Sequence, residues 1–302
     1  MTEPQIGGTY DELLAVAQWA EANDLVSFAR SDHYYSSRQP QPEATDAFAT
    51  LAGLARDTSD IRLCILVTPI TFLHPAVISK TAATIDQMSG GRLDLGVGTG
   101  WMEAEHEAFG FPFPPSAERF ERLEQALGYL RATFGPGHQS FAGAHYTLDA
   151  DSLPQPTGLR TIVGGSGAVK TPTLASRFAG EYNHFTATPE TIAPKIRVMR
   201  QAAEIAGRDP SAIRVSVMGP TLVAADESAY QDKLTVAAAS RDTTPRQLEE
   251  KWLAMGFPVG SADRAQTIVA ELEEVGVDLM YVQLLELSEL DALTEMFDAL
   301  RS

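Results

Sequence analysis

A single cysteine, Cys64, occurs in the 302 residues of this chain. One thiol excludes an internal disulfide and any zinc site built on several cysteines. Cys64 lies within an apolar run that is typical of a strand, and this favours a buried structural thiol over a nucleophile. The cysteine content therefore indicates a reduced, packed interior and no thiol chemistry.

The sequence also lacks a run of 18 apolar residues, and its N-terminus has no basic segment followed by an apolar core. Neither a transmembrane helix nor a secretory signal is predicted, so we expect a cytoplasmic protein. Basic residues are scarce as well, with 23 Lys and Arg against 40 Asp and Glu and a net charge of −17. Because this charge repels nucleic acid and anionic membranes, we expect a small-molecule substrate instead of either partner.

Helical and strand patterns alternate along nearly the whole chain. Predicted strands lie at residues 26–33, 61–69, 93–97, 161–167, 182–185, 214–224 and 278–285. Predicted helices lie at residues 10–23, 45–56, 75–88, 116–134, 169–179, 188–206, 262–275 and 290–300. Two segments depart from this alternation: a hairpin-like excursion at about 135–158 and a helical insertion at about 226–256.

Seven strands of this kind form either an open doubly wound sheet or a closed barrel. The N-terminal residues 1–6 supply a short eighth strand, which closes the sheet and removes its edges. The sequence therefore predicts one α/β domain over residues 1–302, a single (β/α)₈ TIM barrel with an insertion and a shortened first strand. We expect residues 1–6 to lie between the second and the eighth strand.

The glycine-rich stretch at residues 85–101 carries the strongest local signal. Gly90 and Gly91 end a helix, and Gly96, Gly98 and Gly100 follow or interrupt the next strand. Such glycines allow a planar or anionic cofactor to approach the backbone at a helix N-terminus. A tight turn without any ligand explains them equally well.

Polar or glycine residues stand at the carboxyl end of most predicted strands, where barrel enzymes place their sites. These residues are Asp32, His33, Thr68, residues 98–101, residues 164–167, His184 and Gln283. His33 is either catalytic or a satisfied polar residue, and Asp32 either joins it or caps a loop. For His74 and His184 a structural role in a loop is preferred, and His106 with Glu103 and Glu107 fits a solvated helical face better than a metal site.

Several motifs together resemble the luciferase-like monooxygenase superfamily, and in particular its deazaflavin (coenzyme F420)-dependent oxidoreductases. They lie at residues 28–34 (FARSDHY), 66–75 (LVTPITFLHP), 88–106 (MSGGRLDLGVGTGWMEAEH), 110–115 (GFPFPP), 118–120 (ERF) and 162–167 (IVGGSG). They occur in order over nearly the whole chain. The resemblance implies a (β/α)₈ barrel with a cofactor ring across its C-terminal mouth and a possible homodimer.

The resemblance also assigns roles to the matching positions. Asp32 and His33 would face the cofactor ring, with His33 handling the proton, and a non-prolyl cis peptide would fall near Leu66, Val67 and Thr68. The cofactor-binding residues would be Leu66, Val67, Thr68, Gly98, Thr99, Gly100, Trp101, Gly164, Gly165, Ser166 and Gly167. The loop 164–167 would bind the cofactor phosphate, with Lys170 as a basic helper, and no metal is implied.

Two departures from the family pattern bear on function. The first strand is nearly absent, and Trp101 stands where sugar-phosphate dehydrogenases of this superfamily carry a glutamate. The leading hypothesis is an F420-dependent oxidoreductase that transfers hydride between the deazaflavin and a small organic substrate. The alternatives are a luciferase-like monooxygenase that uses flavin mononucleotide (FMN), and a cofactor-binding barrel without turnover.

Overall fold

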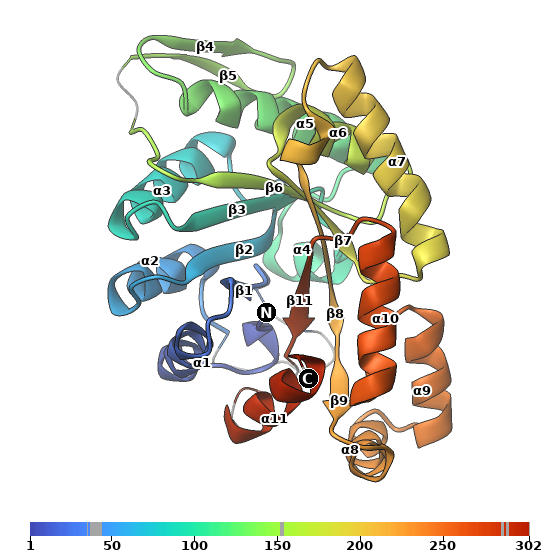
Figure 1. Cartoon of the computed structure of the whole chain (residues 1–302). Helices are drawn as coiled ribbons and strands as arrows, with labels where there is room; N and C mark the ends of the chain where they lie inside the picture. Colours follow the sequence, from blue (N-terminus) through green and yellow to red (C-terminus); the bar gives the residue numbers. More distant parts are fainter. Residues whose placement is uncertain (35, 37–43, 152–153, 285–286, 288–289, 302) are drawn as a thin grey trace.

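The computed structural model of the chain describes residues 1–34, 36, 44–151, 154–284, 287 and 290–301. Seven parallel strands form one curved sheet in the order β1-β2-β3-β6-β7-β8-β11. Their bounds are β1 Ser27–Arg30, β2 Arg62–Pro69, β3 Leu93–Gly98, β6 Arg160–Gly164, β7 Glu181–Phe185, β8 Arg214–Pro220 and β11 Leu279–Gln283. Helices lie outside this ring of strands (Figure 1).

The helices follow the strands as the sequence predicts. They are α1 Tyr10–Ala22, α2 Ala47–Asp57, α3 Pro75–Met88, α4 Glu103–Phe109, α5 Ser116–Thr133, α6 Lys170–Phe178, α7 Pro189–Ile205, α8 Glu227–Ala239, α9 Pro245–Ala254, α10 Ala262–Glu274 and α11 Leu290–Arg301. Side-chain caps fix several starts, such as the capping box of Thr9 and Glu12 and the Asp46 carboxylate that accepts from the Ala49 amide. Among the described residues, no helix is both long and apolar enough to cross a bilayer.

The N-terminal residues close the ring between its two edge strands. The Thr2 amide donates to the Ala29 carbonyl at 2.8 Å, and the Ser31 amide donates to the Thr2 carbonyl at 3.1 Å. On the other side, the Leu284 amide donates to the Met1 carbonyl at 2.8 Å. The predicted barrel and its closure by the N-terminus are confirmed, but the closing element is a bridge at Thr2, because Pro4–Ile6 turns into a 3₁₀ helix.

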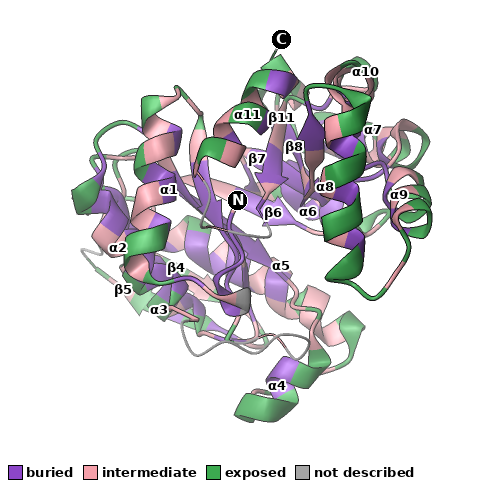
Figure 2. Cartoon of the chain, turned by 90° about the horizontal axis from the view of Figure 1, so that it is seen from below, coloured by how far each residue is buried: buried purple, intermediate pink, exposed green. Residues whose placement is uncertain are grey.

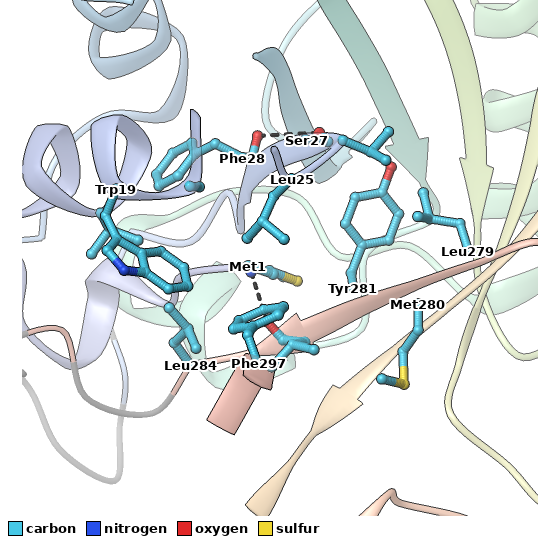
Figure 3. A pocket seen from close by; sticks show the side chains of 14 residues that line it. Met1, Trp19, Leu25, Ser27, Phe28, Leu279, Met280, Tyr281, Leu284 and Phe297 are labelled. Atoms are coloured by element: carbon cyan, nitrogen blue, oxygen red, sulfur yellow. Dashed lines mark hydrogen bonds between the residues drawn. The ribbon is translucent and has the colours of Figure 1, made fainter. Parts of the chain in front are cut away.

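An apolar pocket of about 140 Å³ lies beside this closure (Figure 3). Its walls are the segment that leads into β1, the length of β11, helix α1, Met1 and Phe297 of α11. Asp32 and His33 are not among the residues that line it. It is a packing gap left by the short closing segment.

Three predicted strands end at least three residues earlier in the structure, and one of them is the strand predicted at 161–167, which ends at Gly164. The strand predicted at 26–33 ends at Arg30. The strand predicted at 214–224 is two strands, because the chain turns away from the barrel at Thr221 and β9 (Leu222–Ala224) pairs with β10 (Val259–Ser261) instead. Helices α8 and α9 cover this small sheet and share a hydrophobic core with it, and β4 (Gln139–Ala142) and β5 (Thr147–Ala150) form an antiparallel hairpin.

Buried charges fill the amino-terminal end of the barrel. Asp94 and Glu181 are both 0% exposed. Arg62 binds Asp94 through two nitrogens at 2.7 and 2.9 Å, and Arg214 Nε donates to Glu181 at 2.8 Å. Arg160 Nη1 lies 3.7 Å from an oxygen of each carboxylate. These interactions join β2, β3, β6, β7 and β8 from the inside.

Removing one carboxylate from this cluster should strongly destabilise the fold. In Glu181→Ala, Arg214 and Arg160 lose the anion that compensates their partial burial, and such a loss costs about 3–5 kcal/mol. The measurement is urea unfolding followed by circular dichroism. The control is Glu250→Ala, whose carboxylate pairs with Arg246 on the surface of α9 and should contribute less than about 1 kcal/mol. Equal losses in the two variants would contradict the assigned role of Glu181.

Candidate active site

The predicted site residues lie at the carboxyl ends of four strands. Asp32 and His33 follow β1, Thr68 is near the end of β2, and residues 98–101 and 164–167 follow β3 and β6. Since all these strands are parallel, the residues share one end of the barrel. Gln283 ends β11 at the same end, and its amide donates to Glu3 Oε1 at 2.7 Å.

Strand β2 carries an irregularity where the resemblance implies one. The peptide bond between Leu66 and Val67 is cis, and the pairing register with β3 shifts between Ile65 and Thr68. The Val67 side chain occupies the space beside the glycines of the neighbouring strands. A Cβ added to Gly98 would lie 2.8 Å from Val67 Cγ2, and one added to Gly164 would lie 2.7 Å from Val67 Cγ1. A larger residue at either position would clash with Val67, so packing within the chain is enough to require glycine at both positions.

Asp32 is a buried carboxyl group, 8% exposed, at the mouth. Burial raises the pKa of Asp32 above its usual value, and the neighbouring Thr68 hydroxyl and Arg30 and His33 charges act in the opposite direction. The Thr68 hydroxyl lies near Asp32 and favours the ionised form of that carboxyl group. It does not reach hydrogen-bond geometry with Asp32 or with any other described residue. The mouth therefore contains a buried hydroxyl group that is available to a ligand.

The carboxylate of Glu105, which no sequence pattern identifies as a site residue, contacts His33. Its Nδ1 lies 2.9 Å from Glu105 Oε2, and its side chain is 13% exposed while that of Glu105 is 1% exposed. Burial alone would lower the pKa of His33, but the hydrogen bond and charge of Glu105 outweigh it, so the pKa is raised. At the mouth, Glu105 therefore favours the protonated form of His33.

Aromatic rings surround this pair. Trp101 lies edge-on to His33 with ring centroids 5.8 Å apart and is 71% exposed, so it does not plug the barrel. Tyr34 packs against Phe72, Phe109 and Phe111 at centroid distances of 5.0, 5.1 and 4.9 Å. These contacts attach α4, which projects from one end of the barrel, to the loop after β1 (Figure 2).

His106 differs from the prediction of a solvated helical face. It is 1% exposed, its Nδ1 lies 2.8 Å from the Met102 carbonyl, and its Nε2 lies 2.7 Å from the Thr71 hydroxyl. A carbonyl only accepts, so Nδ1 donates and Nε2 accepts from Thr71. His106 is a satisfied buried histidine. His74 is structural too, because its ring accepts from the Ala76 amide at the start of α3.

The loop 164–167 is contacted by a cation from a different helix than predicted. Lys195 of α7 donates to the Ser166 carbonyl at 2.9 Å and to His184 Nε2 at 2.6 Å. Burial and the Lys195 charge lower the pKa of His184 to about 4, so this ring is neutral. Lys170 instead lies over the Phe120 ring at 5.2 Å. His184 therefore supports the loop and does not handle protons at the mouth.

Arg30 is a buried charge at the end of β1. It points neither into the barrel nor to its mouth, and it makes no ion pair with a described carboxylate. Its guanidinium donates to the Thr45 and Asp46 carbonyls at 2.7 and 3.1 Å and to the Thr50 hydroxyl at 2.8 Å. Burial lowers the pKa of Arg30 to about 10. The residue anchors the start of α2 against β1.

Glu105 and Lys195 are the two site residues that sequence reasoning missed. Glu105 stands among Glu103 and Glu107 in a helix without an apolar stripe, and no local signal separates the buried glutamate from the exposed ones. Lys195 is one of several basic residues on α7, and its position beside Ser166 depends on the packing of α7 against α6.

Comparison with known proteins identifies the family of this chain. The family model for luciferase-like monooxygenases matches residues 1–280. The chain belongs to this family. Pyrimidine monooxygenase RutA of Escherichia coli (strain SMS-3-5 / SECEC) is 33% identical over 172 residues, which cover 54% of this chain and 47% of RutA. The alignment thus spans about half the length of that relative.

Two solved structures illustrate the cofactors of similar folds. An F420-dependent secondary alcohol dehydrogenase, in complex with an F420-acetone adduct, has a TM-score of 0.79 at 20% identity, with 97% of this chain and 96% of that chain covered. The oxygenating constituent of 3,6-diketocamphane monooxygenase from Pseudomonas putida, in complex with FMN, has a TM-score of 0.78 at 15% identity, with 96% and 91% covered. At these identities the likeness establishes the barrel fold alone. The chain is thus a barrel that belongs to a family of enzymes. The two proteins of similar fold were solved with a deazaflavin adduct and with a flavin.

The contact between Val67 and Gly164 can be tested by a double-mutant cycle. Gly164→Ala places its Cβ against Val67, and such overpacking should cost about 1–3 kcal/mol of unfolding free energy. Adding Val67→Ala should recover most of this loss, because it removes the methyl groups that clash. Thermal unfolding of the single and double variants checks this. Additive losses would show that the glycine is required by another group.

Proposed function

We propose that this protein is an F420-dependent oxidoreductase that acts on a small organic substrate at the carboxyl end of the barrel. The observation that carries the proposal is the contact of 2.9 Å between His33 Nδ1 and the buried Glu105 carboxylate, which raises the pKa of His33 beside Asp32. When bound, the deazaflavin would supply hydride exchange at its C5 carbon. A hydride moved to or from a carbonyl or hydroxyl compound requires a matching proton transfer, and His33 would provide it.

The residues at the mouth fit such a cofactor. The hydroxyl of Thr68 is buried without a hydrogen-bond partner among the described residues, which suits a polar edge of a ring system. The residues assigned to ring contacts are Leu66, Val67, Thr68, Gly98, Thr99, Gly100 and Trp101. Asp32, if protonated, can donate to a ring oxygen, and its raised pKa favours that state.

The cofactor phosphate is assigned to the loop of Gly164, Gly165, Ser166 and Gly167. Helix α6 begins after this loop without a side-chain cap, so its first amides are free to bind an anion. Lys195 adds a positive charge at Ser166. In this assignment Lys195 takes the role that the sequence suggested for Lys170.

An FMN-dependent monooxygenase is the second candidate. It is favoured by the 33% identity to pyrimidine monooxygenase RutA over the matched half of the chain. Both cofactors carry a phosphate and a planar ring, so the same loop and mouth would serve either. The two candidates differ in the ring that binds more tightly and in whether turnover requires oxygen.

Cofactor titration separates the two candidates. We expect the protein to bind F420 more tightly than FMN when each is followed by quenching of its fluorescence. Lys195→Met should weaken F420 binding by about tenfold, because a lost charge-assisted contact costs about 1.5 kcal/mol, while Lys170→Met should have little effect. Tighter binding of FMN, with oxygen-dependent turnover, would replace the proposed function by the second candidate.

His33→Ala tests the proton-transfer role. Reduction of a panel of ketones and enones with reduced F420 would first identify a substrate. The variant should then lose about 10²–10⁴-fold in kcat, with little change in the F420 dissociation constant, because general acid catalysis acts on the transition state. Turnover close to that of the unmodified enzyme would show that His33 is structural.

A further inference from the structure

Helix α4 presents one glutamate to the mouth and its neighbours to solvent. Glu105 is 0% exposed, while Glu103 and Glu107 are exposed. Glu105 Oε2 lies 2.9 Å from His33 Nδ1, and Oε1 accepts a hydrogen bond from the Tyr34 amide. A carboxylate 72 positions away in the chain thus contacts both the ring and the backbone of the segment that carries His33.

These contacts determine which nitrogen of His33 carries the exchangeable proton. An ionised carboxylate only accepts hydrogen bonds, so Nδ1 must hold a hydrogen that it donates to Glu105. Nε2 makes no hydrogen bond with any residue in the described part of the chain. A single nitrogen therefore remains for a ligand.

We infer that Glu105 is a positioning residue that holds His33 through Nδ1, so that Nε2 is the atom that gives a proton to the substrate. This inference rests on the proposed role of His33. Glu105 acts through the histidine and has no assigned contact with substrate or cofactor.

The charges around His33 indicate the direction of proton transfer. Three carboxyl groups interact with it: Glu105 of α4, Glu3 of the closing segment and Asp32 beside it in the chain. Burial lowers the pKa of His33, but Glu105 and then Glu3 and Asp32 raise it above the ordinary value. A raised pKa keeps the imidazolium form at pH values where a free histidine has lost its proton. The site is therefore built to donate a proton.

Proton donation matches the reduction of a carbonyl compound. A bound reduced deazaflavin would supply a hydride, with its two electrons, to the carbonyl carbon of the substrate. The π electrons of the C=O bond move to the oxygen, the Nε2–H bond of His33 breaks, and an O–H bond forms. The products would be an alcohol, the oxidised deazaflavin, whose ring N–H proton is released to solvent, and a neutral His33, which takes up a proton from solvent through its 13% exposed side chain.

Histidine NMR of the cofactor-free protein tests the inference without turnover. The six histidines are labelled with ¹⁵N, and the His33 signals are identified by their absence in His33→Ala. In Glu105→Gln the charge is removed while the shape is kept, and the titration midpoint of His33 should fall by about 1–3 pH units. The matched control is Glu103→Gln. Glu103 is exposed and lies two residues before Glu105 in α4, so the titration midpoint of His33 should not change.

A second variant guards against a folding defect in Glu105→Gln. Glu105→Asp keeps the charge but shortens the side chain, and its midpoint should lie between those of Glu105→Gln and the unmodified protein. With a ketone substrate, reduction by Glu105→Gln should also be lost at a lower pH, since the acid form of His33 is depleted earlier as pH rises. The control Glu103→Gln should retain the original pH profile.

The outcomes separate this inference from the proposed function. An unchanged His33 midpoint in folded Glu105→Gln would overturn the positioning role, whatever the enzyme's reaction. A midpoint that falls, together with a pH profile that moves with it, supports the role. If the midpoint falls but His33→Ala keeps normal turnover, His33 is no proton donor and the inference is overturned, while F420-dependent turnover itself would still uphold the proposed oxidoreductase.

Discussion

The barrel depends on the compensation of two buried carboxylates at its amino end. Asp94 and Glu181 are completely enclosed, and Arg62, Arg160 and Arg214 offset the cost of burying them. Each arginine stands at the start of a strand and reaches a carboxylate on a neighbouring strand. The ionic cluster therefore links five neighbouring strands from inside the barrel.

Above this cluster the interior changes in layers along the barrel axis. A middle layer of Ala29, Cys64, Leu66, Ile162 and Tyr281 is apolar in its packing, and the Cys64 thiol is buried as predicted. The upper layer is polar again: Gln283 donates to Glu3 at 2.7 Å, and Ser31 donates to Gln5 at 2.8 Å. The apolar layer separates the charge cluster, in which guanidinium and carboxylate groups pair with one another, from a mouth in which the buried Thr68 hydroxyl has no hydrogen-bond partner among the described residues.

The sequence predicted those properties that depend on local pattern. Strand and helix alternation predicted the barrel, and the edge argument predicted closure by the first residues, because both follow from periodicity and chain order. It did not predict that Thr2 alone bridges the edges or that the chain leaves the barrel at Thr221. Those features depend on pairings between residues far apart in sequence, which no local pattern records.

The same limit explains the glutamate of α4. This helix has seven residues, too few to be stable on its own, and it has no apolar stripe to bury. Its position is fixed from outside by the aromatic packing of Phe109 on Tyr34 and by the buried polar contacts of Glu105 and His106. A buried carboxylate is costly unless it is hydrogen-bonded or paired with a charge. The contact between Glu105 and His33 therefore stabilises α4 and orients the histidine ring. The contact between Glu105 and His33 thus contributes both to the position of α4 and to the raised pKa of His33.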